Sequence, residues 1–442
     1  MTTLQYRDLP DVLYQDVPSS EFDSTDIIAM NLPLAETLGL SAEWLQSDDG
    51  QAVMSGQNAT GGGPGLAMAY GGHQFGSWSG SLGDGRARLV GDLPDEAGRR
   101  HELHLKGAGR TPYSRRGDGK ATLGSAIREY IVSEAMAALG VPTTRSLSVV
   151  TTGETILRNG PEPAAILCRT ARSHIRVGTF QIAAASGEIE TVKALADFAI
   201  DRLYADAPAD GPKRYQYFLE QVIKGQASLI SKWMGYGFIH GVMNTDNACI
   251  SGETIDYGPC AFMDEFHPGK VFSSIDRNGR YAWNRQPEIG HWNMTRLAET
   301  ILPLLGETED VQQAAAQSAL ATFTDVFSAQ FHRVMAHKLG LREGTDLTPD
   351  FLAKTFDATM SGQVDFTLFF RNLTRVASGE DAGILTALFQ DEARGTAWIE
   401  LWQSVTNFNG NLDAAQIARM RRSNPIIIAR NHRVEAAIAD AN

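Results

Sequence analysis

The residues of this chain with the clearest capacity for chemistry lie in a short polar segment of its second half. The segment HGVMNTDN spans residues 240–247, and DYG at 256–258 begins nine residues after Asn247. Amide and carboxylate oxygens are ligands that hard divalent cations take, and a carboxylate can also accept a proton. The spacing therefore predicts a metal site at Asn247 and Asp256, with Asp246 beside it as a general base.

The order of these residues is typical of a protein-kinase catalytic loop. Kinases have H-R-D, four further residues and Asn, followed later by D-F-G, and this Asn and the second Asp hold magnesium ions. From His240 to Asn247 the spacing matches, and D-Y-G stands for D-F-G. Val242 occupies the position of the usual catalytic Asp and can accept no proton. Two unrelated turns are the alternative, because both segments are good turn sequences.

A lysine at the end of an alternating run is the next candidate. In ELHLK, residues 102–106, Leu103 and Leu105 fall on one face of a strand, and His104 and Lys106 fall on the other. The glycine-rich GAGR that follows allows close approach of backbone to a ligand. We interpret Lys106 as a phosphate-binding residue, with a solvent-exposed lysine as the alternative.

A glutamate on the helix predicted for residues 123–139 would pair with this lysine and orient its ammonium toward phosphates, as in kinases. Glu129 and Glu134 are both candidates. On a helical wheel Glu134 lies nearer the centre of the apolar stripe, and Glu129 lies off it. Periodicity alone leaves the choice open, and a surface glutamate is the alternative for either.

Three arginines and two glycine runs indicate an anion site. Arg169, Arg172 and Arg176 lie within eight residues of an otherwise acidic protein, and Arg binds phosphate in bidentate fashion. A solvated basic turn is the alternative. The runs GGHQFG at 71–76 and GDGR at 83–86 could wrap a nucleotide, although glycine runs alone are weak evidence.

The elements that must position these residues follow from the apolar pattern. Short apolar runs bounded by Gly, Pro or Asn predict strands at RARLVGD, ELHLKG, RSLSVVTT and AAILCRT, with one helix at 123–139 between them. From about residue 188 helical periodicity dominates, and it is interrupted by one loop-rich interval at about 239–285 that contains the polar segment. Catalytic groups tend to lie on loops held by a scaffold.

The predicted fold is α+β: a protein-kinase-like bilobal fold with a strand-rich N-lobe, one key helix and a mainly helical C-lobe. We predict an N-terminal extension at 1–65 with a short helix near residues 31–40, an N-lobe at 66–187 and a C-lobe at 188–442. The glycine-rich stretch at 61–65 predicts a flexible connection.

Composition limits the partners. The 442 residues include 43 % hydrophobic and 21 % charged residues, which is typical of a globular protein of two or three packed units. A net charge of −13 argues against a nucleic-acid partner, which requires a basic face. No apolar run approaches the roughly 20 residues that span a bilayer, so no membrane association is expected.

The three cysteines predict no metal or disulfide framework. Cys168, Cys249 and Cys260 form no CxxC pair, and their number is odd. The first residues are acidic and resemble neither a secretory signal nor a basic transit peptide. We therefore expect reduced thiols in a cytoplasmic protein.

Taken together, the motifs resemble the selenoprotein O family of protein adenylyltransferases, from about residue 31 to near the C-terminus. The resemblance is carried by YGGHQFGSWSGSLGDGRA, HLKGAGRTPYSRRGDGKA, IREYIVSEAMAALGVPTTRSL, CRTARSHIRVGTF, HGVMNTDNACISGETIDYGPCAFMD and YAWNRQPEIGHWNMTRLAE. It implies a kinase-like pseudokinase that binds ATP in a flipped orientation with Mg²⁺ or Mn²⁺. The implied activity is transfer of AMP to Ser, Thr or Tyr hydroxyls of other proteins.

The resemblance also implies roles residue by residue. Lys106 matches the phosphate-binding lysine and Glu129 its ion-pair partner. Asn247 and Asp256 match the metal ligands, and Asp246 matches the general base. The implied nucleotide contacts are Gly83, Gly85, Arg86, Lys106, Asp118, Gly119, Arg169 and Arg176, of which the last two hold the outer phosphates.

The sequence departs from the family pattern at its end. Many members carry a late cysteine or selenocysteine, which in some forms a redox-sensitive disulfide, whereas this sequence ends AAIADAN. Cys260 matches the internal cysteine of that pattern and has no late partner here. The competing interpretations are a conventional kinase and a non-catalytic nucleotide-binding pseudokinase scaffold. Retention of Lys106, Asn247 and Asp256 argues against the scaffold.

Overall fold

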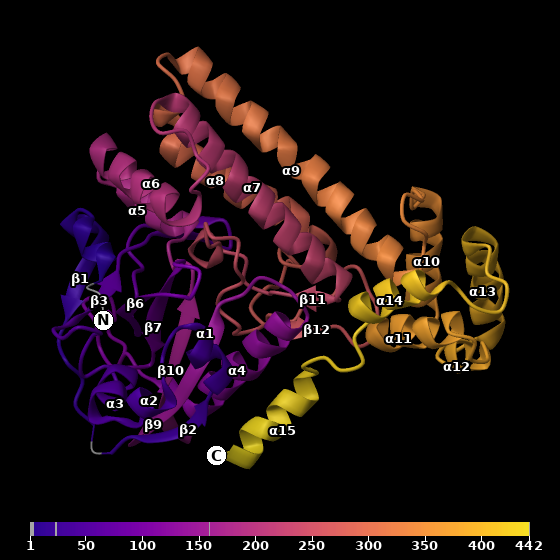
Figure 1. Cartoon of the computed structure of the whole chain (residues 1–442), viewed down its shortest axis with the longest axis horizontal. Helices are drawn as coiled ribbons and strands as arrows, with labels where there is room; N and C mark the ends of the chain where they lie inside the picture. The colour runs from indigo at the N-terminus through magenta and orange to yellow at the C-terminus, as the bar shows by residue number, and fades with distance from the viewer. Residues whose placement is uncertain (1–3, 23, 159, 442) are drawn as a thin grey trace.

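Strands gather in the N-terminal half of the molecule and helices in the C-terminal half. The computed structural model describes residues 4–22, 24–158 and 160–441. The strands form the N-lobe, and the long helices α7, α8 and α9 cross above it (Figure 1). This is the α+β arrangement expected of a kinase-like bilobal fold, so the predicted fold class is confirmed.

One antiparallel sheet forms the N-lobe, with strands in the order β1-β3-β6-β7-β10-β9-β2 and β8 beside β10. The four runs predicted as strands are confirmed as β6, β7, β9 and β10. The bounds are β1 (Tyr14–Val17), β2 (Asp26–Met30), β3 (Gly65–Met68), β6 (Ala87–Pro94), β7 (Arg100–Lys106), β8 (Ala121–Thr122), β9 (Arg145–Leu157) and β10 (Pro161–Ala171).

The N-terminal segment takes part in this sheet. Strand β1 pairs with β3, and β2 pairs with β9, so residues before 65 supply two of its strands. The predicted short helix is present as α1 (Leu32–Thr37), followed by α2 (Ala42–Gln46) and α3 (Asp48–Met54). The division of the chain at residues 65 and 187 stays a prediction.

Helix α4 (Leu123–Ala138) is the one helix that interrupts the main strands, as predicted. It begins where the Thr122 hydroxyl accepts a hydrogen bond from Ser125 N, and it ends before Gly140, whose φ of +72° suits glycine. Its apolar face packs on the sheet in a cluster of Leu123, Ala126, Val149, Ala165 and Leu167. The C-terminal helix α15 (Asn431–Ala441) lies against α4 on another side.

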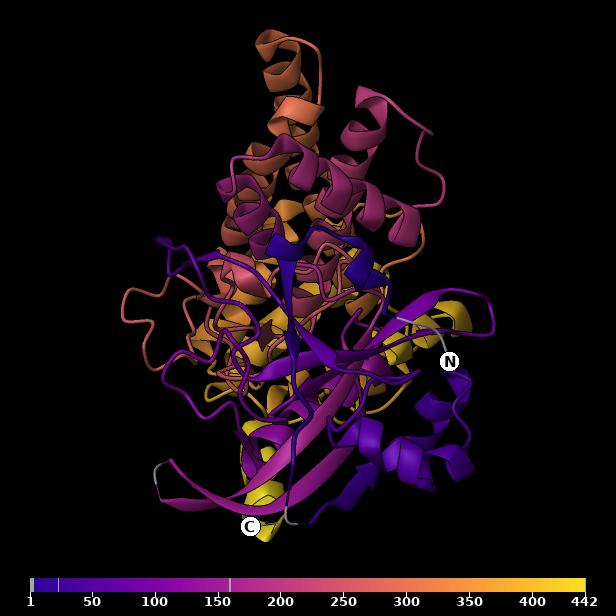
Figure 2. The same ribbon diagram turned by 90° about the vertical axis from the view of Figure 1, so that its left-hand side faces the viewer.

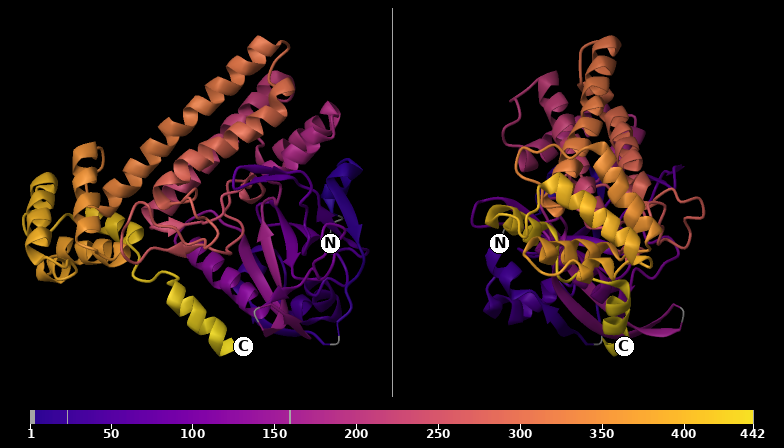
Figure 3. Two further views of the ribbon diagram at one scale, coloured as in Figure 1. Left: turned by 180° about the vertical axis from the view of Figure 1, so that it is seen from behind. Right: turned by 90° about the vertical axis from the view of Figure 1, so that its right-hand side faces the viewer.

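The C-lobe is built around three long helices. Helix α7 packs along both α8 and α9, and these helices lie above the sheet in Figure 2. A group of shorter helices gathers at one end of α9 (Figure 3). The bounds are α5 (Val177–Ala185), α6 (Ile189–Leu203), α7 (Pro212–Gly235), α8 (Gln286–Ile301), α9 (Glu309–Lys338), α10 (Pro349–Ser361), α11 (Phe366–Ala377), α12 (Gly383–Thr386), α13 (Glu392–Thr406) and α14 (Ala414–Ser423).

The predicted loop-rich interval is also present. Between α7 and α8 the chain forms only the short pair β11 (Phe238–Ile239) and β12 (Ala261–Phe262) and the single turns η3 (Thr245–Asn247) and η4 (Trp283–Arg285). The polar segment at 240–258 is held by this framework against the N-lobe sheet. None of the helices in the described part of the chain has the length and apolar character needed to cross a membrane.

Candidate active site

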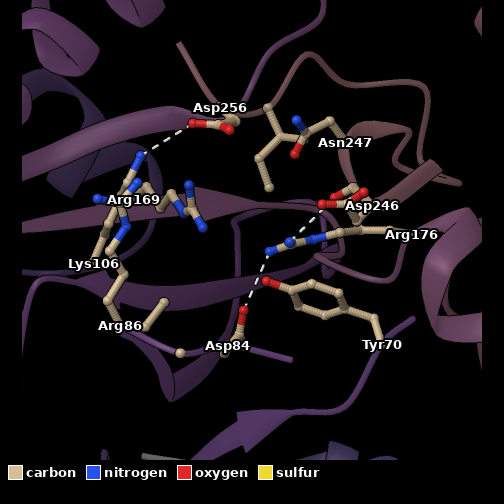
Figure 4. A pocket seen from close by; sticks show the side chains of 12 residues that line it. Tyr70, Asp84, Arg86, Lys106, Arg169, Arg176, Asp246, Asn247 and Asp256 are labelled. Atoms are coloured by element: carbon tan, nitrogen blue, oxygen red, sulfur yellow. Dashed lines mark hydrogen bonds and ion pairs between the residues drawn. The ribbon is translucent and has the colours of Figure 1, made fainter. Parts of the chain in front are cut away.

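A small polar cavity lies between the sheet and the loop-rich segment. Its volume is about 110 Å³. Eight of the predicted site residues line it: Gly85, Arg86, Lys106, Arg169, Arg176, Asp246, Asn247 and Asp256. Tyr70, Asp84, Ala87 and Ile255 complete the lining (Figure 4). The fold therefore brings together residues that are up to 186 positions apart in the chain, from Tyr70 to Asp256.

A larger cavity of about 440 Å³ adjoins the small one. This larger cavity is lined by the three predicted nucleotide contacts that do not line the small one: Gly83, Asp118 and Gly119. Tyr70, Gly85, Arg86 and Asp246 belong to both linings. The two cavities therefore form one continuous site, and Asp246 lies at their junction.

Lys106 projects from the end of the central strand β7 and forms an ion pair with Glu129 of α4. Its ammonium also lies 3.3 Å from Asp256 Oδ1. Burial alone would raise the pKa of Glu129, but the charges of Lys106 and Arg169 hold it below its ordinary value. The ammonium is thereby fixed at the wall of the small cavity.

The helical wheel placed the wrong glutamate nearest the core. The Glu129 side chain is 3 % exposed, whereas that of Glu134 is 21 % exposed. Glu134 accepts hydrogen bonds from Arg145 and from Ser146 N instead, at the edge of the helix. The helical wheel ranked the two glutamates wrongly because α4 is covered by the sheet and also by the loop-rich segment. The second contact buries a face of the helix that is not purely apolar.

A continuous chain of polar contacts joins the two predicted phosphate-binding arginines. Arg169 donates to Glu129 Oε1 at 3.0 Å and to His104 Nδ1 at 3.1 Å. His104 Nε2 lies 2.9 Å from Asp84 Oδ2, and Arg176 lies 3.4 Å from Asp84 Oδ1. All five side chains are buried. The guanidinium groups are therefore held in place by protein partners.

His104 is neutral in this chain of contacts. Because Arg169 Nε is always a donor, His104 Nδ1 accepts and Nε2 carries the proton that is donated to Asp84. Burial lowers the pKa of His104 to about 4, despite the nearby carboxylate of Asp84. Burial would raise the pKa of Asp84, but the His104 donor and the charges of Arg176 and Arg169 hold it well below its usual range.

The third arginine of the predicted anion pocket lies elsewhere. Arg172 donates to the backbone oxygen of Arg202 and lines a different surface pocket with Arg99 and Arg100. The end of the strand explains this, because Arg169 lies within β10 and pairs with Glu129 of α4, whereas Arg172 follows the last residue of that strand. Of the three, only Arg169 and Arg176 contribute to the cavity.

The catalytic-loop residues face the cavity from the opposite side. Asp246 and Asn247 lie in the turn η3, and Asn247 Nδ2 donates to Val242 O at 3.0 Å, which leaves its amide oxygen as the atom available to a cation. Asp256 has a φ of +67°, a left-handed conformation that aspartate tolerates better than most residues. Burial raises the pKa of Asp246 above its ordinary value, against the opposing effects of a hydrogen bond from Gln74 and the charge of Arg176.

Asn247 and Asp256 fit a metal that is shared with phosphate groups. Among residues 4–22, 24–158 and 160–441, no cluster of three or more His, Cys, Asp or Glu side chains could hold an ion. Mg²⁺ is usually bound by one or two carboxylates together with substrate phosphates, and one carboxylate and one amide in a cationic cavity match that pattern.

Val242, at the position of the kinase base, lies outside both cavities. It lines a separate surface pocket with Gly258, Cys260 and residues of α15. His240 is buried and contacts the backbone oxygen of Ile255 at 2.8 Å, so it supports the loop rather than the chemistry. All three cysteines are buried and unpaired, and burial raises the pKa of each thiol to about 12.

Sequence reasoning missed Asp84, His104 and Gln74. Asp84 stands inside the GDGR run that was noted only for its glycines, and His104 alternates with Lys106 on β7. Gln74 belongs to the run GGHQFG, which was considered as a nucleotide wrap. The run contributes to a hairpin, β4 (Gly72–Gln74) and β5 (Ser77–Ser79), that packs on both α5 and the turn η3, and Gln74 lines the larger cavity. The signal that could have identified Asp84 and Gln74 from the sequence is the presence of polar side chains within both glycine runs.

Comparison with known proteins places these features in one family. The family model described as Protein adenylyltransferase SelO matches residues 2–442. Protein nucleotidyltransferase YdiU of Rhodopseudomonas palustris (strain BisB5) is 51 % identical over 442 residues, which cover 99 % of this chain and 89 % of the relative. The protein of the same name from Shewanella denitrificans is 48 % identical over 449 residues, covering 99 % and 88 %. That of Methylorubrum populi is 47 % identical over 440 residues, covering 98 % and 88 %.

Proposed function

Because the chain belongs to the SelO family of protein adenylyltransferases and is a protein nucleotidyltransferase, we propose that it transfers AMP from ATP to Ser, Thr or Tyr hydroxyls of other proteins. The net charge of −13 favours protein over nucleic acid as the acceptor. We also propose a cytoplasmic location, which suits three unpaired cysteines.

The observation that carries this proposal is the position of Asp246 between two unlike cavities. The small cavity of about 110 Å³ holds Lys106, Arg169 and Arg176, which suits phosphate groups and is too small for a nucleoside as well. The larger cavity of about 440 Å³ has room for the nucleoside beside Asp118 and Gly119. ATP bound in this flipped sense presents its α-phosphate at the junction.

The residues then have distinct roles in the transfer. Asp246 takes the proton of the acceptor hydroxyl, whose oxygen forms a bond to the α-phosphorus while the bond to the bridging oxygen of pyrophosphate breaks. Lys106, Arg169 and Arg176 hold the negative charge of the departing pyrophosphate. Asn247 and Asp256 would hold a Mg²⁺ or Mn²⁺ ion, whose contribution is to neutralise phosphate charge.

Parallel incubations with α-labelled and γ-labelled ATP test the function. We expect label on protein from the α position alone, with one pyrophosphate released per AMP transferred. The same reaction without added divalent metal serves as the control and should give no label. Label from the γ position without pyrophosphate would show a conventional kinase, and label from neither would show a non-catalytic protein.

Arg176→Gln tests the flipped orientation. If Arg176 holds the outer phosphates, its loss should weaken ATP binding by about 10- to 100-fold, as expected for a hydrogen bond to a charged group. Affinity for AMP should change by less than about threefold. Both affinities can be measured by calorimetry with the metal ion present.

Arg172→Gln is the matched control for that experiment, because it removes a guanidinium from the same stretch of chain but outside the cavity. It should leave both affinities unchanged. An equal loss of AMP and ATP binding in Arg176→Gln, in a protein with an unchanged melting temperature, would place the nucleoside or α-phosphate at Arg176 and contradict the flipped orientation.

A further inference from the structure

The β4–β5 hairpin is bonded to the catalytic loop along its first strand. His73 N donates to Thr245 Oγ1 at 2.7 Å, and Phe75 N donates to Asn244 Oδ1 at 3.1 Å. Gln74, between them, donates from Nε2 to Asp246 Oδ2 at 3.1 Å. Three consecutive residues of the hairpin thus contact three consecutive residues of the loop, although the two segments are about 170 positions apart.

Two glycines permit this close approach. A Cβ atom at Gly72 would lie 2.7 Å from Asp246 Oδ1, and one at Gly178 would lie 2.3 Å from Gly71 O. Both distances are shorter than real Cβ contacts allow, so a side chain at either position would push the hairpin or the Asp246 carboxylate aside. The glycine run therefore allows the hairpin to pack on the base itself.

The two oxygens of Asp246 have different surroundings. Oδ2 accepts the hydrogen bond from Gln74, whereas Oδ1 is buried and has no hydrogen-bond partner in the described part of the chain. A buried carboxylate oxygen without a partner costs free energy, so the bond from Gln74 to Oδ2 is the side-chain hydrogen bond that orients this carboxylate. Because Gln74 also lines the larger cavity, the bond comes from the side on which the nucleoside would lie.

We infer that Gln74 is a positioning residue for Asp246, the proposed general base: its side-chain amide holds Oδ2 and, together with the close approach of Gly72 to Oδ1, fixes the orientation of the carboxylate at the junction of the two cavities. The inference rests on the proposed function. It assigns to the glycine-rich hairpin the role of orienting the base, in addition to bordering the nucleotide.

Gln74→Ala and Gln74→Glu test the inference, because alanine removes the donor and glutamate replaces it with a carboxylate of the same length. In both variants the kcat of AMP transfer should fall by about 10- to 100-fold, the range found for supporting partners of catalytic groups. The KM and Kd for ATP should change by less than about threefold. Ser77→Ala, an exposed position on the same hairpin, is the control and should retain full activity.

A double-mutant cycle separates positioning from general support of the fold. With the carboxylate already removed by Asp246→Ala, adding Gln74→Ala should lower the residual rate by less than about twofold. A further loss as large as in the wild-type background would show that Gln74 acts independently of Asp246 and would overturn the inference. A wild-type kcat in Gln74→Ala would overturn it as well. Absence of AMP transfer by the unmodified protein would instead remove the proposed function.

Discussion

Asp256→Asn is expected to lower the rate of AMP transfer by about 10³-fold or more. A bound divalent ion contributes several kcal/mol of charge stabilisation to phosphoryl chemistry, and each 1.4 kcal/mol corresponds to about tenfold in rate. Three carboxylates line the small cavity in the described part of the chain: Asp84 contacts His104 and Arg176, Asp246 is the proposed base, and Asp256 is the one left to share an ion with Asn247 and the phosphates. Loss of its charge therefore removes the main protein contribution to metal binding.

Asparagine is the appropriate replacement because residue 256 has a φ of +67°. Asparagine tolerates this left-handed conformation, whereas alanine would add backbone strain to the loss of charge. The rate should be measured across a titration of Mg²⁺ and of Mn²⁺, together with the melting temperature. Asp264→Asn, an exposed aspartate in the same loop-rich interval, is the control. Wild-type turnover by Asp256→Asn at ordinary metal concentrations would exclude the metal role.

Asp246→Asn is expected to reduce kcat by about 10²- to 10⁴-fold, the range that general acid–base catalysis contributes. The substitution preserves the shape of the side chain and an oxygen that can accept from Gln74. The affinity for ATP should stay within about threefold of wild type, because a base acts on the acceptor hydroxyl and mainly in the transition state. Single-turnover rates and equilibrium ATP binding measure the two quantities separately.

A carboxylate at the kinase position should not rescue this variant. Val242 lines a surface pocket outside both cavities, so Val242→Asp added to Asp246→Asn should restore neither AMP transfer nor phosphate transfer. Recovery of either activity would show that a group at position 242 can reach the reacting atoms. An unchanged kcat in Asp246→Asn alone would assign the proton to another acceptor.

Much of the fold could be predicted from the sequence because its signals are local. Short apolar runs bounded by Gly, Pro or Asn predicted β6, β7, β9 and β10, and apolar residues at helical spacing over 123–139 predicted α4. The proximity of the metal and base candidates could also be predicted, because Asp246, Asn247 and Asp256 lie within eleven residues of one another on a single segment. Their mutual position depends on few intervening residues.

Contacts between distant segments could not be predicted in the same way. The choice between Glu129 and Glu134 depends on which surfaces cover α4, and neither surface is encoded in the periodicity of the helix. Arg169 and Arg172 looked equivalent in sequence, yet the end of β10 separates them. For the glutamates the deciding factor is burial by segments far away in the chain, and for the arginines it is the residue at which β10 ends.

The sequence by itself thus determined which residues are candidates to bind phosphate, hold a metal and accept a proton, and which local elements carry them. Only the tertiary structure decided that Asp84 and His104 join the two arginines and that Gln74 contacts Asp246. The physical reason is that such polar contacts form where strands, hairpin and loop exclude water together. That geometry is fixed by packing across the whole sheet and not by any short stretch of residues.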